Sequence, residues 1–256
     1  MLAGIIALIG GLVVGVLMGA LGGGGAILAI PLFIYGLGFA AHQATVAALL
    51  IVGIGALSGV LTHVRARHVA APTGLAFGAL GIGGSYLGTR LSAAVDEAVL
   101  LTAFAALVAV VAGLMAHTAW RGRREGQATH GPGRWVAIIV SATTVGFLTG
   151  FFGVGGGFAI VPALTLVVGL EMPLAVGTSL LVILLNTLIA LLLHGGVGQL
   201  PHPGLIAVFA AATIGGTWLG SALGSRASEK TLRLCFAALL AVVSVYTAAR
   251  SIPMLR

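Results

Sequence analysis

The sequence has little charge, few acidic residues and almost no cysteine. Only 7% of its 256 residues are charged, whereas 59% are hydrophobic and the mean hydropathy is +1.19. A soluble domain is about one quarter charged, and no soluble core could bury so much apolar surface. Hydrocarbon can solvate this surface if helices or a closed barrel satisfy the backbone. Because the apolar runs are continuous and do not alternate every second residue, the sequence predicts an all-α polytopic membrane protein.

These shortages exclude several classes of function. The single cysteine, Cys235, rules out a disulfide framework within one chain and a cysteine metal cluster. The histidines from His194 to His202 lack metal-ligand spacing, and no metal site and no cofactor are expected. The basic surplus lacks interleaved aromatic residues, so nucleic acid is not an expected partner. We find no Ser/His/Asp set or paired carboxylates at membrane depth, so an enzyme is not expected.

The five acidic residues all fall in predicted loops or at segment ends. They are Asp96, Glu97, Glu125, Glu171 and Glu229. Proton relays and cation pumps need carboxylates inside the membrane. Their placement therefore argues against both, whereas an anion carrier needs no such groups.

Ten apolar segments are separated by polar residues, glycine or proline. They lie near 4–20, 26–39, 43–64, 72–91, 98–119, 134–152, 157–170, 174–194, 204–223 and 231–249. A full crossing needs about 20 residues. The second and seventh segments are therefore predicted to be short or re-entrant helices at glycine-rich breaks, and a full crossing by either stays open.

The chain contains an internal repeat. An offset of 131 residues places Gly15 on Gly146 and Pro31 on Pro162, and after a one-residue insertion the match continues to Phe104 and Phe236. We predict a first membrane repeat of about five segments at 1–120. A cytoplasmic linker is expected at 121–133, where arginine and glycine gather, and the second repeat at 134–256.

The two repeats are predicted to be inverted, because each holds an odd number of passes. With the amino terminus outside, nine of the twelve Lys and Arg residues fall on the inner side. A rival arrangement fuses the first two segments into one helix and makes the repeats parallel. That helix would be about 54 Å long, far beyond a hydrocarbon core of about 30 Å. We expect a bacterial cytoplasmic (inner) membrane protein with both termini in the periplasm.

Glycine runs mark both breaks and are the first candidate substrate-binding elements. The six glycines are Gly23, Gly24, Gly25, Gly155, Gly156 and Gly157. Glycine lets the backbone approach a ligand, and the helix that follows presents a positive dipole end, which favours an anion. Tight helix packing is the alternative, and it is the interpretation for Gly11, Gly15 and Gly19 at four-residue spacing.

Polar residues inside apolar segments are the remaining candidates. Thr178, Ser179 and Asn186 share one face of the eighth segment and could donate hydrogen bonds to an anion; bonding between helices or to the preceding turn is the alternative for the hydroxyls. His63 and His194 end matching segments and are candidates for proton coupling. Their location at segment ends favours the alternative, a partly hydrated position at the membrane surface, for both histidines.

The chain resembles the sulfite exporter TauE/SafE family of membrane permeases over nearly its whole length. The resemblance rests on Gly19 to Pro31, Gly150 to Pro162, Ala175-Val176-Gly177-Thr178-Ser179-Leu180, Asn186, His194-Gly195-Gly196 and Gly215-Gly216 through Gly220. It implies transport of small sulfur-containing anions, such as sulfite, sulfoacetate or related sulfonates, across the cytoplasmic membrane. Where the family often has a Gly-Thr-Ser-like step in the first copy, this sequence has Ala44-Thr45-Val46-Ala47-Ala48, so its first half offers fewer hydroxyls.

The sequence therefore predicts a secondary transporter that works by alternating access. Its expected partners are a small anionic substrate and the lipid bilayer, and a homo-oligomer stays open. A passive anion channel and a transporter of a non-sulfur anion are the alternatives.

Overall fold

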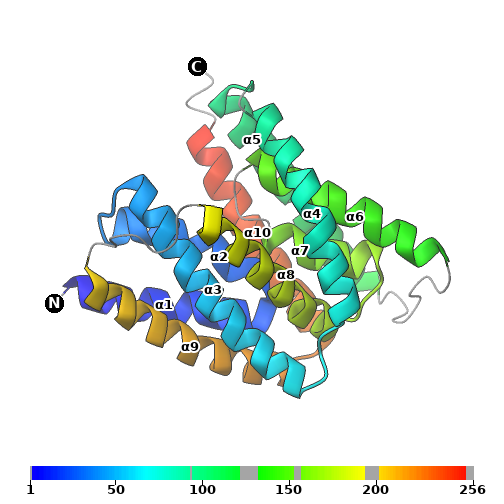
Figure 1. Ribbon diagram of the computed structural model, residues 1–256. Coiled ribbons are helices and arrows are strands. Elements are labelled where there is room, and N and C mark those ends of the chain that lie inside the picture. The colour runs from blue at the N-terminus through cyan, green and yellow to red at the C-terminus, as the bar shows by residue number, and fades with distance from the viewer. Residues whose placement is uncertain (1, 93, 122–131, 153–156, 194–201, 252–256) are drawn as a thin grey trace. The chain divides into compact units, whose positions relative to one another are not determined.

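The computed structural model describes all residues except 1, 93, 122–131, 153–156, 194–201 and 252–256. The described part contains helices and no strands (Figure 1). Its α-helices are α1 (Leu2–Leu21), α2 (Ala26–Pro31), α3 (Ala41–Arg65), α4 (Ala71–Ser92), α5 (Glu97–Arg121), α6 (Pro132–Phe152), α7 (Gly157–Pro162), α8 (Met172–Leu193), α9 (Pro203–Arg226) and α10 (Glu229–Ser251). A 3₁₀ turn, η1 (Gly23–Gly25), precedes α2, and π-helical turns follow α2 and α7, namely η2 (Leu32–Gly36) and η3 (Ala163–Val167).

Seven helices of the described part are long and apolar enough to cross a membrane: α1, α3, α5, α6, α8, α9 and α10. Helix α4 has a similar length but carries six glycines, whose hydropathy is near neutral. The apolar stretches Ala26–Gly36 and Gly157–Val167 are each about 16 Å long at 1.5 Å per residue, half of a hydrocarbon core. The predictions of a polytopic helical membrane protein and of short helices at both breaks are confirmed.

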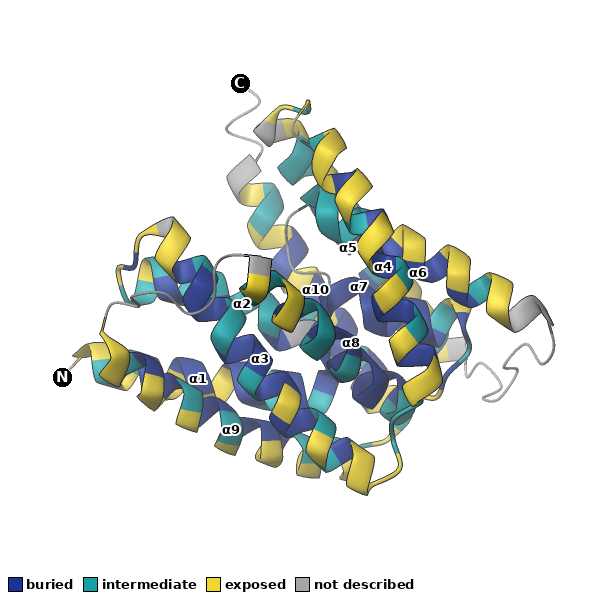
Figure 2. Cartoon of the chain, in the orientation of Figure 1, coloured by how far each residue is buried: buried dark blue, intermediate teal, exposed yellow. Residues whose placement is uncertain are grey.

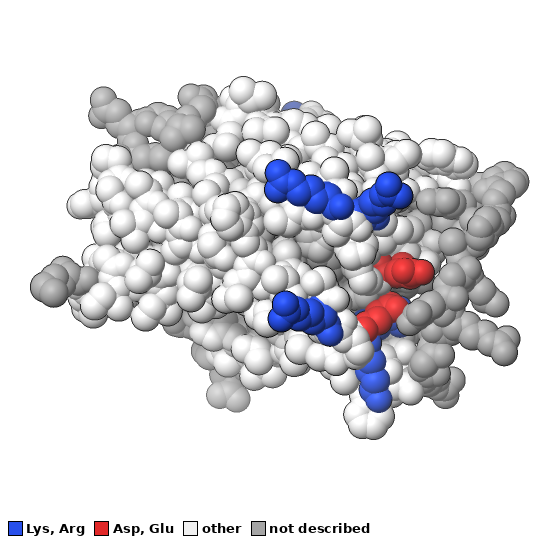
Figure 3. Space-filling view, turned by 90° about the horizontal axis from the view of Figure 1, so that it is seen from below, with Lys and Arg blue, Asp and Glu red and all other residues white. Residues whose placement is uncertain are grey.

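Each long helix buries one face and exposes another (Figure 2). Large apolar side chains are exposed on α1, α5, α6 and α10, for example Ile9 at 57%, Val110 at 60% and Val242 at 67%. Water would penalise this exposure, whereas lipid would not. Charge is scarce on the face drawn in Figure 3, where most of the described surface carries neither Lys or Arg nor Asp or Glu.

The two repeats form the same local structure with the expected offset. Helices α2 and α7 begin 131 residues apart, and the π-turns η2 and η3 follow each after six residues. A left-handed glycine then ends each segment, with φ of 72° at Gly38 and 77° at Gly169. Such φ values strain any residue with a side chain. The same backbone turn therefore follows the short helix in both repeats, and glycine allows it in each.

The chain folds into two compact units that each combine parts of both repeats. Unit 1 consists of 1–78 and 173–226, and unit 2 consists of 79–172 and 227–256. The units are therefore not the two repeats. Most of the predicted linker, at 122–131, lies outside the described residues, so the boundaries of the linker and the repeats stay predictions.

Inversion of the repeats is visible inside unit 1, where the equivalent helices α3 and α8 run in opposite directions. A methyl group added to Gly53 of α3 would lie 3.2 Å from Cγ2 of Thr187, near the end of α8. Near the end of α3, the Cβ of His63 would lie 2.9 Å from a methyl group on Gly177, near the start of α8. Contacts later in the sequence of α3 are therefore made with residues earlier in the sequence of α8, so the two helices are antiparallel.

The equivalent pair α4 and α9 is also opposed. Helix α9 runs with α3, because Gly55 faces Thr213 and, about two turns further along both helices, Thr62 Oγ1 lies 3.2 Å from Ser221 Oγ. The first turns of α4 run with α8, which is antiparallel to α3: Gly74 faces Leu181, and Gly78 faces Leu185. The prediction of inverted repeats is confirmed.

Helices α1 and α2 form a hairpin. A methyl group on Gly25 would lie 2.5 Å from Met18 Cγ, late in α1, and one on Gly36 would lie 3.1 Å from Ile6 Cγ2, early in α1. The chain therefore folds back at the glycine break. The rival arrangement with one continuous helix is wrong.

Glycines allow two helix pairs to approach at backbone distance, and the contacts repeat in both units. In unit 1, a methyl group on Gly15 of α1 would lie 2.2 Å from the Thr213 carbonyl oxygen of α9. In unit 2, one on Gly146 of α6 would lie 2.2 Å from the Gly81 carbonyl oxygen of α4. Because these contacts leave no room for a Cβ, the packing interpretation of the small-residue spacing is confirmed.

Candidate functional site

The break after α1 is a tight turn built on glycine. Gly22 has a φ of 75°, and its N–H donates to Met18 O at 2.9 Å. Gly23 and Gly25 are buried, and Gly25 packs against the backbone of α1, where an added methyl group would lie 2.3 Å from Val14 O. Packing therefore suffices to explain glycine at position 25. An approach of substrate to Gly23, Gly24 and Gly25 stays a prediction.

The polar residues of α8 occupy different surroundings in unit 1. Thr178 is fully buried, and its Oγ1 accepts a hydrogen bond of 3.0 Å from the Ala70 N–H, just before α4. Ser179 is fully buried and donates to Val176 O of its own helix at 2.7 Å. Asn186 is half-buried two turns further along. In the structure both hydroxyls thus serve the packing roles that were the alternative to substrate binding.

His63 is buried near the end of α1. It exposes 8% of its surface, although the sequence favoured a partly hydrated position, and that expectation was wrong. Its Nε2 lies 3.2 Å from Gly19 O, a carbonyl in the last turn of α1. Its Nδ1 is buried without a hydrogen-bond partner among the described residues, and its ring lies 6.1 Å from that of His68. A role in proton coupling stays a prediction.

Hydroxyls that sequence reasoning did not single out line the contact of α3 with α1 and α9. Ser221 Oγ lies 3.4 Å from Gly19 O and 3.2 Å from Thr62 Oγ1. Thr213 and Thr217 are fully buried on the same face of α9, and each donates to the carbonyl four residues before it. Their four-residue spacing on one helix face was the signal that could have revealed them.

Several of the predicted site residues lie in one unit. Unit 1 contains the first glycine turn, His63 and the three polar residues of α8. Gly157 belongs to unit 2, where it begins α7 and is buried. Gly155, Gly156 and His194 lie outside the described residues. The described part of the chain holds no group of three or more His, Cys, Asp or Glu residues placed to bind a metal ion.

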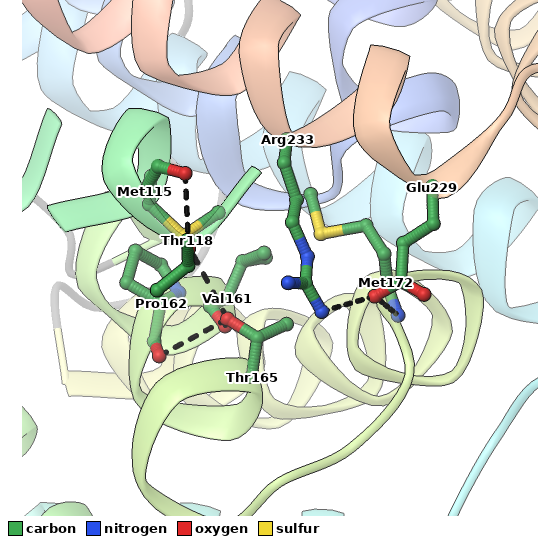
Figure 4. Close-up of polar contacts among 8 residues, drawn as sticks. All are labelled: Met115, Thr118, Val161, Pro162, Thr165, Met172, Glu229 and Arg233. Carbon is green, nitrogen blue, oxygen red and sulfur yellow. Dashed lines mark hydrogen bonds and ion pairs between the residues drawn. The ribbon is translucent and has the colours of Figure 1, made fainter. Parts of the chain in front are cut away.

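Arg233 lies in unit 2 and was not singled out by the sequence analysis. It lies in the second turn of α10, within the tenth predicted segment, and exposes 9% of its surface. Its guanidinium donates to Glu229 Oε1, an oxygen that also accepts a 3.2 Å hydrogen bond from the Met172 N–H at the start of α8. Figure 4 shows the guanidinium extending from α10 toward this segment. The helical spacing Arg233, Phe236, Leu240 already placed it on the buried face.

Inverted repeats and broken half-length helices are typical of secondary transporters. Residues 7–247 match the family described as Sulfite exporter TauE/SafE. The chain therefore belongs to the sulfite exporter TauE/SafE family, as the resemblance predicted.

Relatives agree with this class. The chain is 33% identical over 249 residues to a "Probable membrane transporter protein" of Xylella fastidiosa strain Temecula1, covering 94% of this chain and 93% of that protein. It is 25% identical over 213 residues to the "Probable membrane transporter protein YdhB" of Bacillus subtilis strain 168, covering 83% of this chain and 85% of that protein. No solved structure matches. The protein is a multi-pass membrane transporter.

Proposed function

We propose that the protein is a secondary transporter that moves small sulfur-containing anions, such as sulfite, sulfoacetate or a related sulfonate, by alternating access. The family match over residues 7–247 carries the proposal. We place the protein in the bacterial cytoplasmic membrane with both termini in the periplasm, the orientation that the basic residues favour. Transport, and not catalysis, is the proposed activity.

The fold supplies what such a carrier needs. Opposed copies of one helical unit can exchange inward-open and outward-open states around a shared substrate. Each half-length helix begins at a glycine run of the sequence, and the N–H groups of a helix's first turn can face an anion. On α8, Asn186 is half-buried, and its side-chain amide carries two N–H donors. We propose that these donors bind the substrate.

Flux through reconstituted protein tests the proposal. Proteoliposomes are expected to take up labelled sulfite or sulfoacetate with saturable kinetics, and unlabelled substrate on the opposite side should accelerate exchange. Protein-free liposomes are the control.

Asn186→Leu is expected to raise the half-saturating substrate concentration about tenfold, which corresponds to the loss of one hydrogen bond. The membrane yield of this variant should be unchanged.

Two results would replace the proposal with its alternatives. Flux that is linear in concentration, with a conductance far above carrier turnover, would identify a passive anion channel. Saturable uptake of nitrate or phosphate without any uptake of sulfur anions would identify a transporter of non-sulfur anions.

A further inference from the structure

Arg233 and Glu229 form a charged pair in the interior of unit 2. The Arg233 side chain exposes 11% of its surface and the Glu229 side chain 15%, and the Arg233 residue as a whole exposes 9%. The ion pair lies within one helix, four residues apart, and the contact with the start of α8 is made by Glu229 through the Met172 N–H. Burying a charged pair is often no better for stability than apolar packing. Stability of the fold is therefore a weak reason for this arginine.

The guanidinium has unused hydrogen-bonding capacity. Arginine presents five N–H donors in a planar fork. Arg233 directs its Nη2 to Glu229, while its Nε is buried and has no hydrogen-bond partner among the described residues. A buried donor without a partner is costly. Such a group indicates that a further acceptor completes the site.

The internal repeat shows that the fold accepts an aliphatic residue at this position. Helices α5 and α10 begin at Glu97 and Glu229, 132 residues apart. The counterpart of Arg233 in the first repeat is therefore Leu101. The arginine is a feature of the second copy alone, as expected for a residue that binds a ligand.

We propose that Arg233 is the charged ligand of an oxyanion-binding site in unit 2, and that Glu229 occupies the guanidinium until an anion displaces it. The forked donors of arginine match two oxygens of sulfite or a sulfonate. The choice of a sulfur oxyanion rests on the proposed function. Glu229 would keep its hydrogen bond from Met172 and oppose the anion by its like charge.

The experiment measures the thermal stabilisation of purified protein over a range of sulfite, sulfoacetate, phosphate and nitrate concentrations, because a ligand of the native state raises stability by mass action. Arg233→Leu copies the residue of the first repeat and is expected to fold. It should bind sulfite about tenfold to hundredfold more weakly than the unmodified protein. Glu229→Gln keeps an acceptor for the Met172 N–H and should bind at least as tightly as the unmodified protein.

Lys230→Leu is the matched control, because it removes one positive charge from the same turn of α10. Lys230 is exposed and lies over the Trp120 ring, 5.5 Å from its centroid. Its removal is expected to leave sulfite affinity unchanged. If Lys230→Leu lost as much sulfite affinity as Arg233→Leu, the affinity would depend on the overall positive charge of α10 and not on a site at Arg233. That result would overturn the site.

Two further outcomes would overturn the site without touching the proposed function. One is equal sulfite affinity of the unmodified protein and Arg233→Leu. The other is equal weakening by Arg233→Leu and Glu229→Gln, which would identify a structural ion pair. By contrast, Arg233-dependent stabilisation by phosphate or nitrate, with no response to sulfur anions, would support the site and contradict the proposed substrate class.

Discussion

Replacing Gly84 by alanine is expected to lower the melting temperature of the detergent-purified protein by about 6–12 °C, corresponding to about 3 kcal/mol or more of overpacking. An added methyl group would lie 2.3 Å from Thr143 O and 2.8 Å from Phe147 N, both backbone atoms of α6. A backbone clash cannot be relieved by a side-chain rotation, so α4 and α6 must separate. Thermal unfolding followed by light scattering or tryptophan fluorescence measures the effect.

Gly83, the neighbouring residue, is the matched control. A methyl group there meets nothing within 4 Å, so Gly83→Ala should leave the melting temperature within about 2 °C. The second copy should behave in the same way. Gly216 faces Leu12 O at 2.4 Å, whereas Gly215 is open. Equal melting temperatures for Gly84→Ala and Gly83→Ala would refute the close helix contact.

Gly25→Ala is expected to abolish most of the folded protein, because its methyl group would lie 2.3 Å from Val14 O inside the α1–α2 hairpin. We expect a loss of about 3 kcal/mol or more, visible as a lost monodisperse peak in gel filtration. Gly36→Ala, in the same hairpin, should be milder, because its methyl group would lie 3.1 Å from a side-chain atom, Ile6 Cγ2, and not against backbone. A normal yield of Gly25→Ala would show that the turn is more open than its contacts indicate.

The expected instability of Gly25→Ala limits what transport assays of this variant can show about substrate binding. Lost transport in a variant that does not fold says nothing about substrate. The role of Gly25 in substrate binding must therefore be separated from its role in packing. Asn186 is a cleaner probe, because it is half-buried and its replacement by leucine adds no atom to a glycine position.

Hydropathy and the internal repeat predicted most of the fold. Long apolar runs mark membrane helices because the bilayer sets their length. The repeated Gly-Pro pattern predicted both short helices, since a broken helix needs the same local chemistry in each copy. Inversion followed from counting passes and basic residues. The two compact units could not be predicted, because their helix pairings across the repeats depend on contacts between distant glycines such as Gly15 and Gly216.

The candidate site was harder to predict than the fold. Arg233 lies beside a charged loop in the sequence, where hydropathy suggests hydration, and only the helical spacing of its neighbours indicates burial. His63 was misjudged for a similar reason, since a residue near a helix end can still be covered by another helix, here α1. The partner of Thr178 is Ala70, 108 residues away, and no local pattern identifies it.

Labelling of single cysteines from each side of intact membranes tests the central claim, the opposite orientation of the two halves. Cys235 would first be replaced by alanine, and cysteines placed at Ala3, Arg67, Ser228 and Ala249. We predict that positions 3 and 249 react with an impermeant maleimide from the periplasm, and that positions 67 and 228 react only from the cytosol. Labelling of positions 3 and 67 from the same side would contradict the account.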